Sequence, residues 1–187
     1  MHFTAYVLIP LEKATTSAEA RHQASAYLVD NEFVGGEGRW GSGISDWFVI
    51  GGRWSGSMTM ARLDKKKLKR FWTRFEKQKL GWSGKGIDDN ERKNKISALF
   101  LKYFPDFDVQ KTPCPPTRSP YSDSGYEDDA VIVDDLIWDE IIIPGLKKSL
   151  LEGGAIIHVD GCEESESDLD KEKIVGQCWC VVIDFHC

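Results

Sequence analysis

The turn at residues 46–56 has the residue types of a small anion-binding site. It reads Asp46-Trp47-Phe48-Val49-Ile50-Gly51-Gly52-Arg53-Trp54-Ser55-Gly56. Consecutive glycines let main-chain N–H groups approach a ligand closely, and Arg53 supplies a planar guanidinium that suits a carboxylate or phosphate. Trp47 and Trp54 could flank such a ligand as stacking walls. A plainer interpretation makes the glycines a turn and the tryptophans core residues, with Asp46 pairing Arg53, because the turn fits neither the P-loop nor the dinucleotide-binding motif.

A second candidate set lies in the predicted last strand, residues 177–186. Alternation places an apolar stripe on one face, formed by Trp179, Val181, Ile183 and Phe185, and leaves Cys178, Cys180, Val182, Asp184 and His186 on the other. Burying an unsatisfied polar atom costs about 1–3 kcal/mol, so we expect the polar face to open into a cleft or onto solvent. There Asp184 could orient His186 for acid–base chemistry. The alternative is an exposed strand end without a role.

The cysteines of this strand raise the question of a metal. Cys178 and Cys180, with His186 or His158, have ligand atoms that suit zinc. A Cys-x-Cys pair within an apolar strand is more typical of two small buried residues, because structural zinc sites normally use Cys-x2-Cys turns. We therefore predict no metal and no cofactor.

The basic segment at residues 65–79 resembles a nucleic-acid footprint, because lysines and arginines alternate there with Phe71, Trp72 and Phe75. The aromatic residues recur at helical spacing, which favours an amphipathic helix with a solvated lysine face. We do not expect a nucleic-acid partner. The chain carries a formal net charge of −6, with acidic residues concentrated between positions 127 and 172, so the basic segment could pair internally or form a binding face.

Length and composition favour one globular domain spanning residues 1–187, with a Pro-rich loop at residues 111–129 and an acidic insert at residues 163–172. The first apolar run stops at Pro10, which is too short for a signal peptide or a membrane span. The five cysteines are odd in number and lack the spacing of a disulfide framework. We therefore expect a cytoplasmic protein with reduced thiols and no membrane association.

The elements that must position these residues mix strands and helices without strict alternation. This order favours an α+β fold with one mixed, mainly antiparallel sheet of about five or six strands and three or four helices. Strands are predicted at residues 3–9, 47–50, 130–133, 137–143, 155–159 and 177–186, with a hairpin across the glycines into residues 57–63. Helices are predicted at residues 17–29, after a capping box at Thr16, then after Asp64, at residues 88–104 and at residues 145–151.

The 46–56 motif resembles the signature of a group of uncharacterised bacterial and phage proteins. Their last strand is similar to Val182-Ile183-Asp184-Phe185-His186-Cys187, and their middle hairpin to residues 130–134 followed by Trp138. This chain differs in its acidic insert and in Ile141-Ile142-Ile143, where that group carries a Gly-Trp segment. The resemblance implies a phage or mobile-element setting and no particular activity.

Three hypotheses of function follow. The first is a phage-type cytosolic binding module that captures a small anionic or nucleotide-like ligand with Arg53, Trp47 and Trp54. In this hypothesis Asp184 and His186 line the same cleft. The second is an acid–base enzyme of the hydrolase type, in which Asp184 or Asp46 orients His186 as general base and Arg53 stabilises developing charge. The third is an acidic inhibitor that binds a host protein through residues 127–129 and 163–170, as a counter-defence factor would.

Overall fold

The computed structural model describes residues 2–31, 33, 47–80, 89–109, 127–146, 148, 154–159 and 170–186. The chain divides into two compact units, which we call the sheet unit (Met1–Ala61 with Ser119–Cys187) and the helical unit (Arg62–Arg118). Whether both belong to one folding domain stays a prediction, since compactness alone does not establish independent folding.

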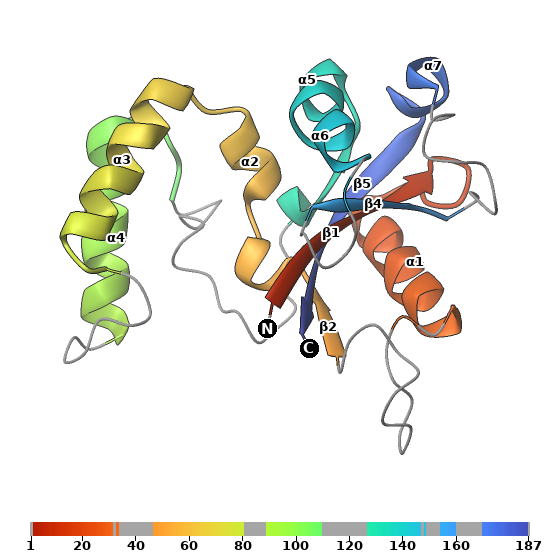
Figure 1. Cartoon of the computed structure of the whole chain (residues 1–187), viewed down its shortest axis with the longest axis horizontal. Coiled ribbons are helices and arrows are strands. Elements are labelled where there is room, and N and C mark those ends of the chain that lie inside the picture. The colour runs from red at the N-terminus through yellow and green to blue at the C-terminus, as the bar shows by residue number, and fades with distance from the viewer. Residues whose placement is uncertain are drawn as a thin grey trace. The chain divides into compact units, whose positions relative to one another are not determined.

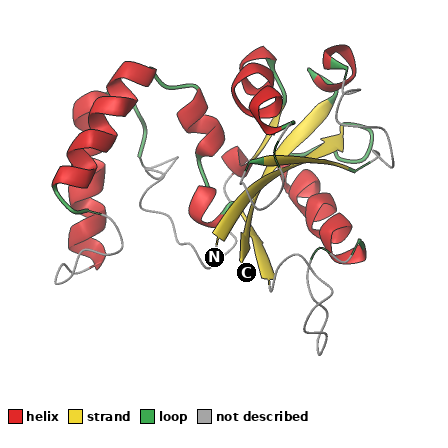
Figure 2. Cartoon of the chain, in the orientation of Figure 1, coloured by secondary structure: helices red, strands yellow, loops and turns green. Residues whose placement is uncertain are grey.

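The sheet unit is built around two nine-residue strands, β1 (His2–Pro10) and β5 (Cys178–His186), which pair antiparallel over their whole length. On the far side of β1, β4 (Ala155–His158) pairs parallel. On the far side of β5, β2 (Trp47–Ile50) pairs with residues 183–186 and β3 (Ala130–Ile132) with residues 179–181, both antiparallel. The result is a mixed, mainly antiparallel five-stranded sheet, which confirms the predicted α+β class (Figures 1 and 2).

One face of the sheet packs against helix α1 (Ser17–Asp30), whose small residues Ala20 and Ala24 are buried there (Figure 1). Thr16 caps this helix by accepting a hydrogen bond from the Glu19 N–H at 3.1 Å, as the capping box predicts. The buried strand residues of this face come from alternate positions, namely Phe3, Ala5, Val7, Ile9, Ile50, Ala130, Val181, Ile183 and Phe185. The predicted apolar stripe of β5 is confirmed, with Trp179 partly buried at its end.

The opposite face is covered by short helical segments (Figure 1). These are α2 (Ser57–Ala61), α5 (Asp135–Ile137), the π-helical turn η4 (Trp138–Ile142), α6 (Ile143–Gly145) and α7 (Lys171–Ile174). All of them except α6 contribute apolar side chains that pack with Leu8, Cys178, Cys180 and Val182 into a second apolar cluster. Much of the β5 face that we expected to be open is therefore core.

Two predicted strands are wrong. Residues 137–143 form the α5–η4–α6 segment, in which Asp134 caps the helix by accepting from the Ile137 N–H at 2.9 Å. A short apolar run fits a buried helix as well as a buried strand, so periodicity could not distinguish them. Residues 57–61 form α2 rather than the second arm of a hairpin. Methionine and alanine favour helices, and this preference outweighs the alternation of Met58 and Met60.

The helical unit contains α3 (Lys65–Lys77) and α4 (Asp89–Tyr103). Asp64 caps α3 by accepting from the Lys67 N–H at 2.7 Å, as predicted. An aromatic cluster joins the two helices, and Phe71 and Phe100 meet edge to face with ring centroids 5.1 Å apart. These contacts confirm that the aromatic residues of α3 form the buried side of an amphipathic helix.

Some predictions concern residues outside the described ranges. Most of the Pro-rich loop (residues 111–129) is among them, and its last three residues form the 3₁₀ turn η3 (Glu127–Asp129). Of the acidic insert, Asp170 and Glu172 are described, where Asp170 caps α7 by accepting from the Glu172 N–H at 3.0 Å. Asp46 also lies outside the described residues.

Candidate functional site

A histidine–carboxylate pair lies at one end of the strands, where β1 and β2 begin and β5 ends. Nδ1 of His2 lies 2.8 Å from Oδ1 of Asp184, across neighbouring strands. Asp184 is 0% exposed and the His2 side chain is 10% exposed. A carboxylate only accepts hydrogen bonds, so Nδ1 of His2 carries the hydrogen and Nε2 is left to accept or deliver a proton.

The glycine turn supplies the second partner of this carboxylate. The main-chain N–H of Arg53 donates to Oδ2 of Asp184 at 2.8 Å, and the N–H of Gly51 donates to the Val182 carbonyl at 2.8 Å. The 3₁₀ turn η1 (Gly52–Trp54) follows directly, with the Trp54 N–H bonded to the Gly51 carbonyl at 2.9 Å. The turn thus donates a main-chain hydrogen bond to a carboxylate of the chain itself, Asp184.

Gly52 permits this approach. Its φ is +51°, and an added Cβ would lie 2.5 Å from Cγ2 of Val49 and 2.8 Å from Cβ of Asp184. Only a residue without a side chain leaves room for the carboxylate against the main chain in this conformation. The glycine at position 52 is therefore explained by contact between the turn and β5.

Three aromatic rings contact one another beside this pair, those of His2, Trp47 and His186. Trp47 stacks on His186 with centroids 4.8 Å apart and planes 9° apart. His2 meets His186 edge to face at 4.8 Å and Trp47 at 5.6 Å. These contacts follow from the register, which places His186 opposite both His2 and Trp47. We call the set His2, Trp47, Arg53, Asp184 and His186 the edge cluster.

The structure brings most of the predicted site residues together. Trp47, Gly51, Gly52, Arg53, Asp184 and His186 all lie in or beside the edge cluster. The side chain of Arg53 is exposed, and Trp54 is 38% exposed, so Trp54 does not fill the core. The expectation that Asp184 faces an open cleft is wrong, because a buried carboxylate with two donors needs no solvent.

His2 was missed by the sequence analysis. A single histidine near the start of an apolar strand resembles many others. The signal that could have found it is the pairing of the first and last strands, which sets His2 opposite His186 and two residues from the position opposite Asp184.

Further along the same sheet face, Tyr6, Cys178 and Cys180 belong to or pack against the second apolar cluster. Burial raises the pKa of Tyr6 to about 12, with a smaller opposing effect from the Ser57 hydroxyl. Burial also raises the pKa of the Cys180 thiol, and neighbouring Cys178 adds to the shift. Both are free thiols in the second apolar cluster. Among the residues that the structure describes, no three His, Cys, Asp or Glu side chains are grouped so as to hold a metal ion.

A second buried carboxylate fixes the segment that follows the glycine turn. Oδ1 of Asp129 accepts from the Ser55 hydroxyl at 2.6 Å and from the Gly56 N–H at 3.4 Å. The neighbouring Asp128 accepts from the Thr59 hydroxyl at 2.8 Å. These hydrogen bonds attach α2 and the residues between η1 and α2 to the η3 turn.

No protein-family model, curated protein or solved structure matches this chain. No helix in the described part of the chain is both long and apolar enough to cross a membrane.

Proposed function

We propose that the edge cluster binds a small anionic ligand with a planar group, such as a nucleotide. The observation that carries the proposal is that both oxygens of Asp184 already have hydrogen-bond partners within the cluster, the His2 ring and the Arg53 N–H. A buried carboxylate left unpaired would repel an anion. Because Asp184 is hydrogen-bonded to His2 and to the main chain, the exposed guanidinium of Arg53 is available to attract an anion.

Aromatic surface beside this cation favours a ligand with a ring. The partly buried Trp47 and the exposed Trp54 lie on either side of Arg53 in the chain, and Trp47 is already held flat against His186. A flat, fixed aromatic ring binds a base or sugar at little entropic cost. We further propose a phage-related, cytoplasmic setting, which the sequence resemblance and the reduced thiols of Cys178 and Cys180 favour.

The test uses three probes, inorganic phosphate, adenosine and adenosine monophosphate, added to the purified full chain. We expect adenosine monophosphate to raise the melting temperature most, because it offers both charge and ring. Arg53→Gln should abolish the gain and leave the unliganded melting temperature unchanged, because the main-chain bond to Asp184 is kept. The matched control is Lys173→Gln, which removes an exposed charge from α7. No shift with any probe, or an equal shift in Arg53→Gln, rejects the proposal.

Acid–base catalysis is the second candidate, and the His2–Asp184 hydrogen bond is what favours it. The ring that the carboxylate contacts is His2, so His2 takes the role that we first gave to His186. In a hydrolysis, Nε2 of His2 would remove a proton from water as the oxygen attacks an ester. The ester bond would break, and the proton would then pass to the leaving oxygen.

Chromogenic esters test this candidate. We would measure release of p-nitrophenolate from bis-p-nitrophenyl phosphate and from p-nitrophenyl acetate. His2→Asn can still donate to Asp184 but cannot relay a proton, so it should fold and lose turnover by about 100-fold or more. Turnover equal in wild type and His2→Asn, or absent in wild type, excludes this chemistry.

A further inference from the structure

Charge is sharply divided between the two units of the chain. The helical unit holds 16 of the 24 lysines and arginines against 7 of the 30 aspartates and glutamates, a net charge of +9. The sheet unit holds the remaining 8 basic and 23 acidic residues, a net charge of −15. The helical unit is therefore strongly basic, although the whole chain has a net charge of −6.

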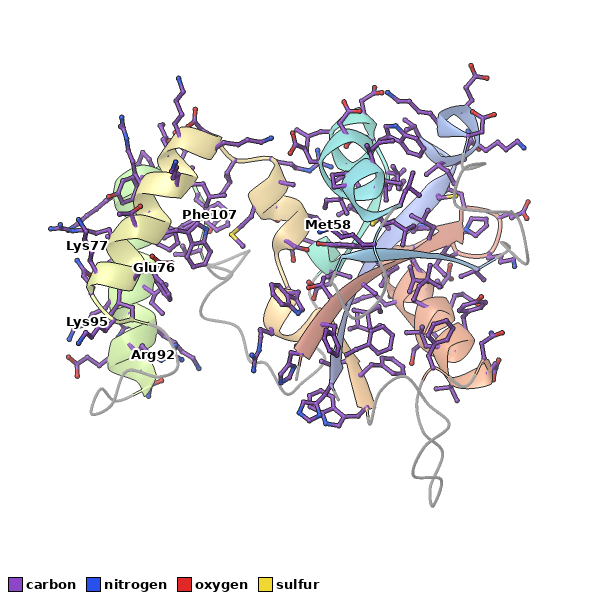
Figure 3. The ribbon with its side chains drawn as sticks, in the orientation of Figure 1. Met58, Glu76, Lys77, Arg92, Lys95 and Phe107 are labelled. Carbon is purple, nitrogen blue, oxygen red and sulfur yellow. The ribbon has the colours of Figure 1, made fainter. Side chains whose placement is uncertain are left out.

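The basic residues of α3 line a groove. Its volume is about 510 Å³, and the side chains around it are Lys66, Lys69, Arg70, Thr73, Arg74, Lys77 and Tyr103. Five of these seven are cationic, and none of the described lining residues is acidic. Lys77 extends outward from α3 (Figure 3). A hollow with this lining concentrates positive potential.

The helix period explains how these residues come to share one side. Positions 66, 69, 70, 73, 74 and 77 recur at intervals of three and four, so they form a continuous stripe about 16 Å long. The opposite stripe is apolar and contains Phe71, Trp72 and Phe75, which pack in the aromatic cluster with α4. The cationic stripe is therefore held in place by a packed helix pair.

We propose that this groove binds the phosphate backbone of a nucleic acid. Duplex DNA carries one charge per about 1.7 Å, so a stripe of about 16 Å spans several phosphates. Arg70 and Arg74 offer forked donors that match phosphate oxygens, and the partly buried ring of Tyr103 offers a surface for a sugar or base. The sequence alone favoured a solvated lysine face with no partner. The groove, with Tyr103 in its lining, is the structural observation that favours a bound ligand. The inference is independent of the edge cluster.

A lipid surface fits this helix less well. Amphipathic helices that bind membranes insert an apolar face beside their basic one. In α3 the apolar residues pack against α4 in the aromatic cluster, and Phe71 is fully buried. A nucleic acid can bind through the cationic side of α3 alone, without displacing these apolar contacts.

The experiment compares two charge-matched double variants of the full chain. Lys69→Gln with Arg74→Gln removes two groove charges, whereas Lys65→Gln with Lys67→Gln removes two exposed charges of the same helix outside the groove. Binding is measured by fluorescence anisotropy with a labelled 20-nucleotide single strand and with its duplex, over a range of salt. Circular dichroism checks that both variants keep their helices.

We expect the wild type to bind at least one of the two probes. The groove variant should bind about tenfold or more weakly, with the slope of log K against log salt reduced by about 2. The control variant should lose less than about threefold. The proposal is overturned if the wild type binds neither probe or if both variants lose affinity equally. It is also overturned if polyglutamate of equal charge competes as well as unlabelled nucleic acid, since that outcome indicates an acidic protein partner.

Discussion

The main-chain N–H of Arg53 donates a 2.8 Å hydrogen bond to Oδ2 of Asp184, a residue 131 positions further along the chain. This bond ties the turn after β2 to the end of β5. Asp184 is thereby held between the turn and His2 of β1. The contact between the turn and Asp184 depends on the close approach that Gly52 allows.

Gly52→Ala should destabilise the protein by about 2–4 kcal/mol. The new methyl group would meet Val49 and Asp184 within 2.8 Å, and φ of +51° is costly for any residue with a Cβ. Urea denaturation measures the change in unfolding free energy. The matched control is Gly176→Ala, where φ is +72° and nothing lies within 4 Å of the added Cβ, so the cost should be only about 1 kcal/mol. Equal costs at the two positions would show that the packing around Gly52 is looser than described.

Helix-capping residues and strand alternation predicted several helices and strands correctly. Thr16 and Asp64 cap their helices in the structure, and the alternation in residues 177–186 identified β5 and its buried face. These features depend on neighbours in the chain, so the sequence exposes them directly.

Contacts between distant segments could not be predicted in the same way. The His2–Asp184 pair joins residues 182 positions apart, and it requires knowing that the first and last strands are neighbours. The polar residues of β5 were expected to face a cleft because no partner for them is visible in the sequence. In the structure Asp184 has two donors, and Cys178 and Cys180 pack as small apolar groups.

Lys79→Gly should stabilise the helical unit by about 0.5–1 kcal/mol. Lys79 has φ of +53°, and the Leu80 N–H bonds to the Phe75 carbonyl while the Lys79 N–H bonds to that of Glu76, a helix end that usually carries glycine. Thermal unfolding followed by circular dichroism gives the change. Gln78→Gly, at φ of −85°, is the control and should destabilise by a similar amount. A lower melting temperature for Lys79→Gly would contradict this account of the helix end.

Tyr6→Phe should make stability less sensitive to alkali. Burial raises the pKa of Tyr6 from 10.0 to about 12, so the folded state favours the neutral phenol. The stability that this provides is fully present below pH 10 and is lost as the pH rises from 10 to 12. Unfolding free energies measured at pH 9, 10 and 11 should fall more steeply in the wild type than in Tyr6→Phe. Parallel profiles would mean that Tyr6 is not buried as a neutral phenol.

Trp47 and His186 should be energetically coupled. Their stacked geometry, with centroids 4.8 Å apart, predicts an interaction of about 0.5–1.5 kcal/mol in a double-mutant cycle with alanine at each position. The control is a second cycle that pairs Trp47 with Tyr27, and it should give a coupling near zero. Tyr27 contacts Phe33 on the other side of the sheet. If the first cycle also gives zero, the two rings do not stack in solution.

Asp184 is the residue on which the edge cluster depends most. Asp184→Ala leaves the Arg53 N–H and the His2 ring without their acceptor, and it should cost about 2–5 kcal/mol. Asp184→Asn keeps the shape, and its amide oxygen can still accept from Arg53, so we expect a smaller cost of about 1–2 kcal/mol.

The two variants also separate the partners of the carboxylate. Combining Asp184→Ala with His2→Ala should cost less than the sum of the single changes, because the His2 ring that has lost its acceptor is then removed as well. Salt should change these values little, since the carboxylate is fully buried and counterions do not reach it. Urea denaturation at 0.05 M and 1 M sodium chloride measures both effects. If Asp184→Ala unfolds at the same urea concentration as the wild type, the carboxylate does not join the turn to the sheet, and the binding site proposed at this edge loses its foundation.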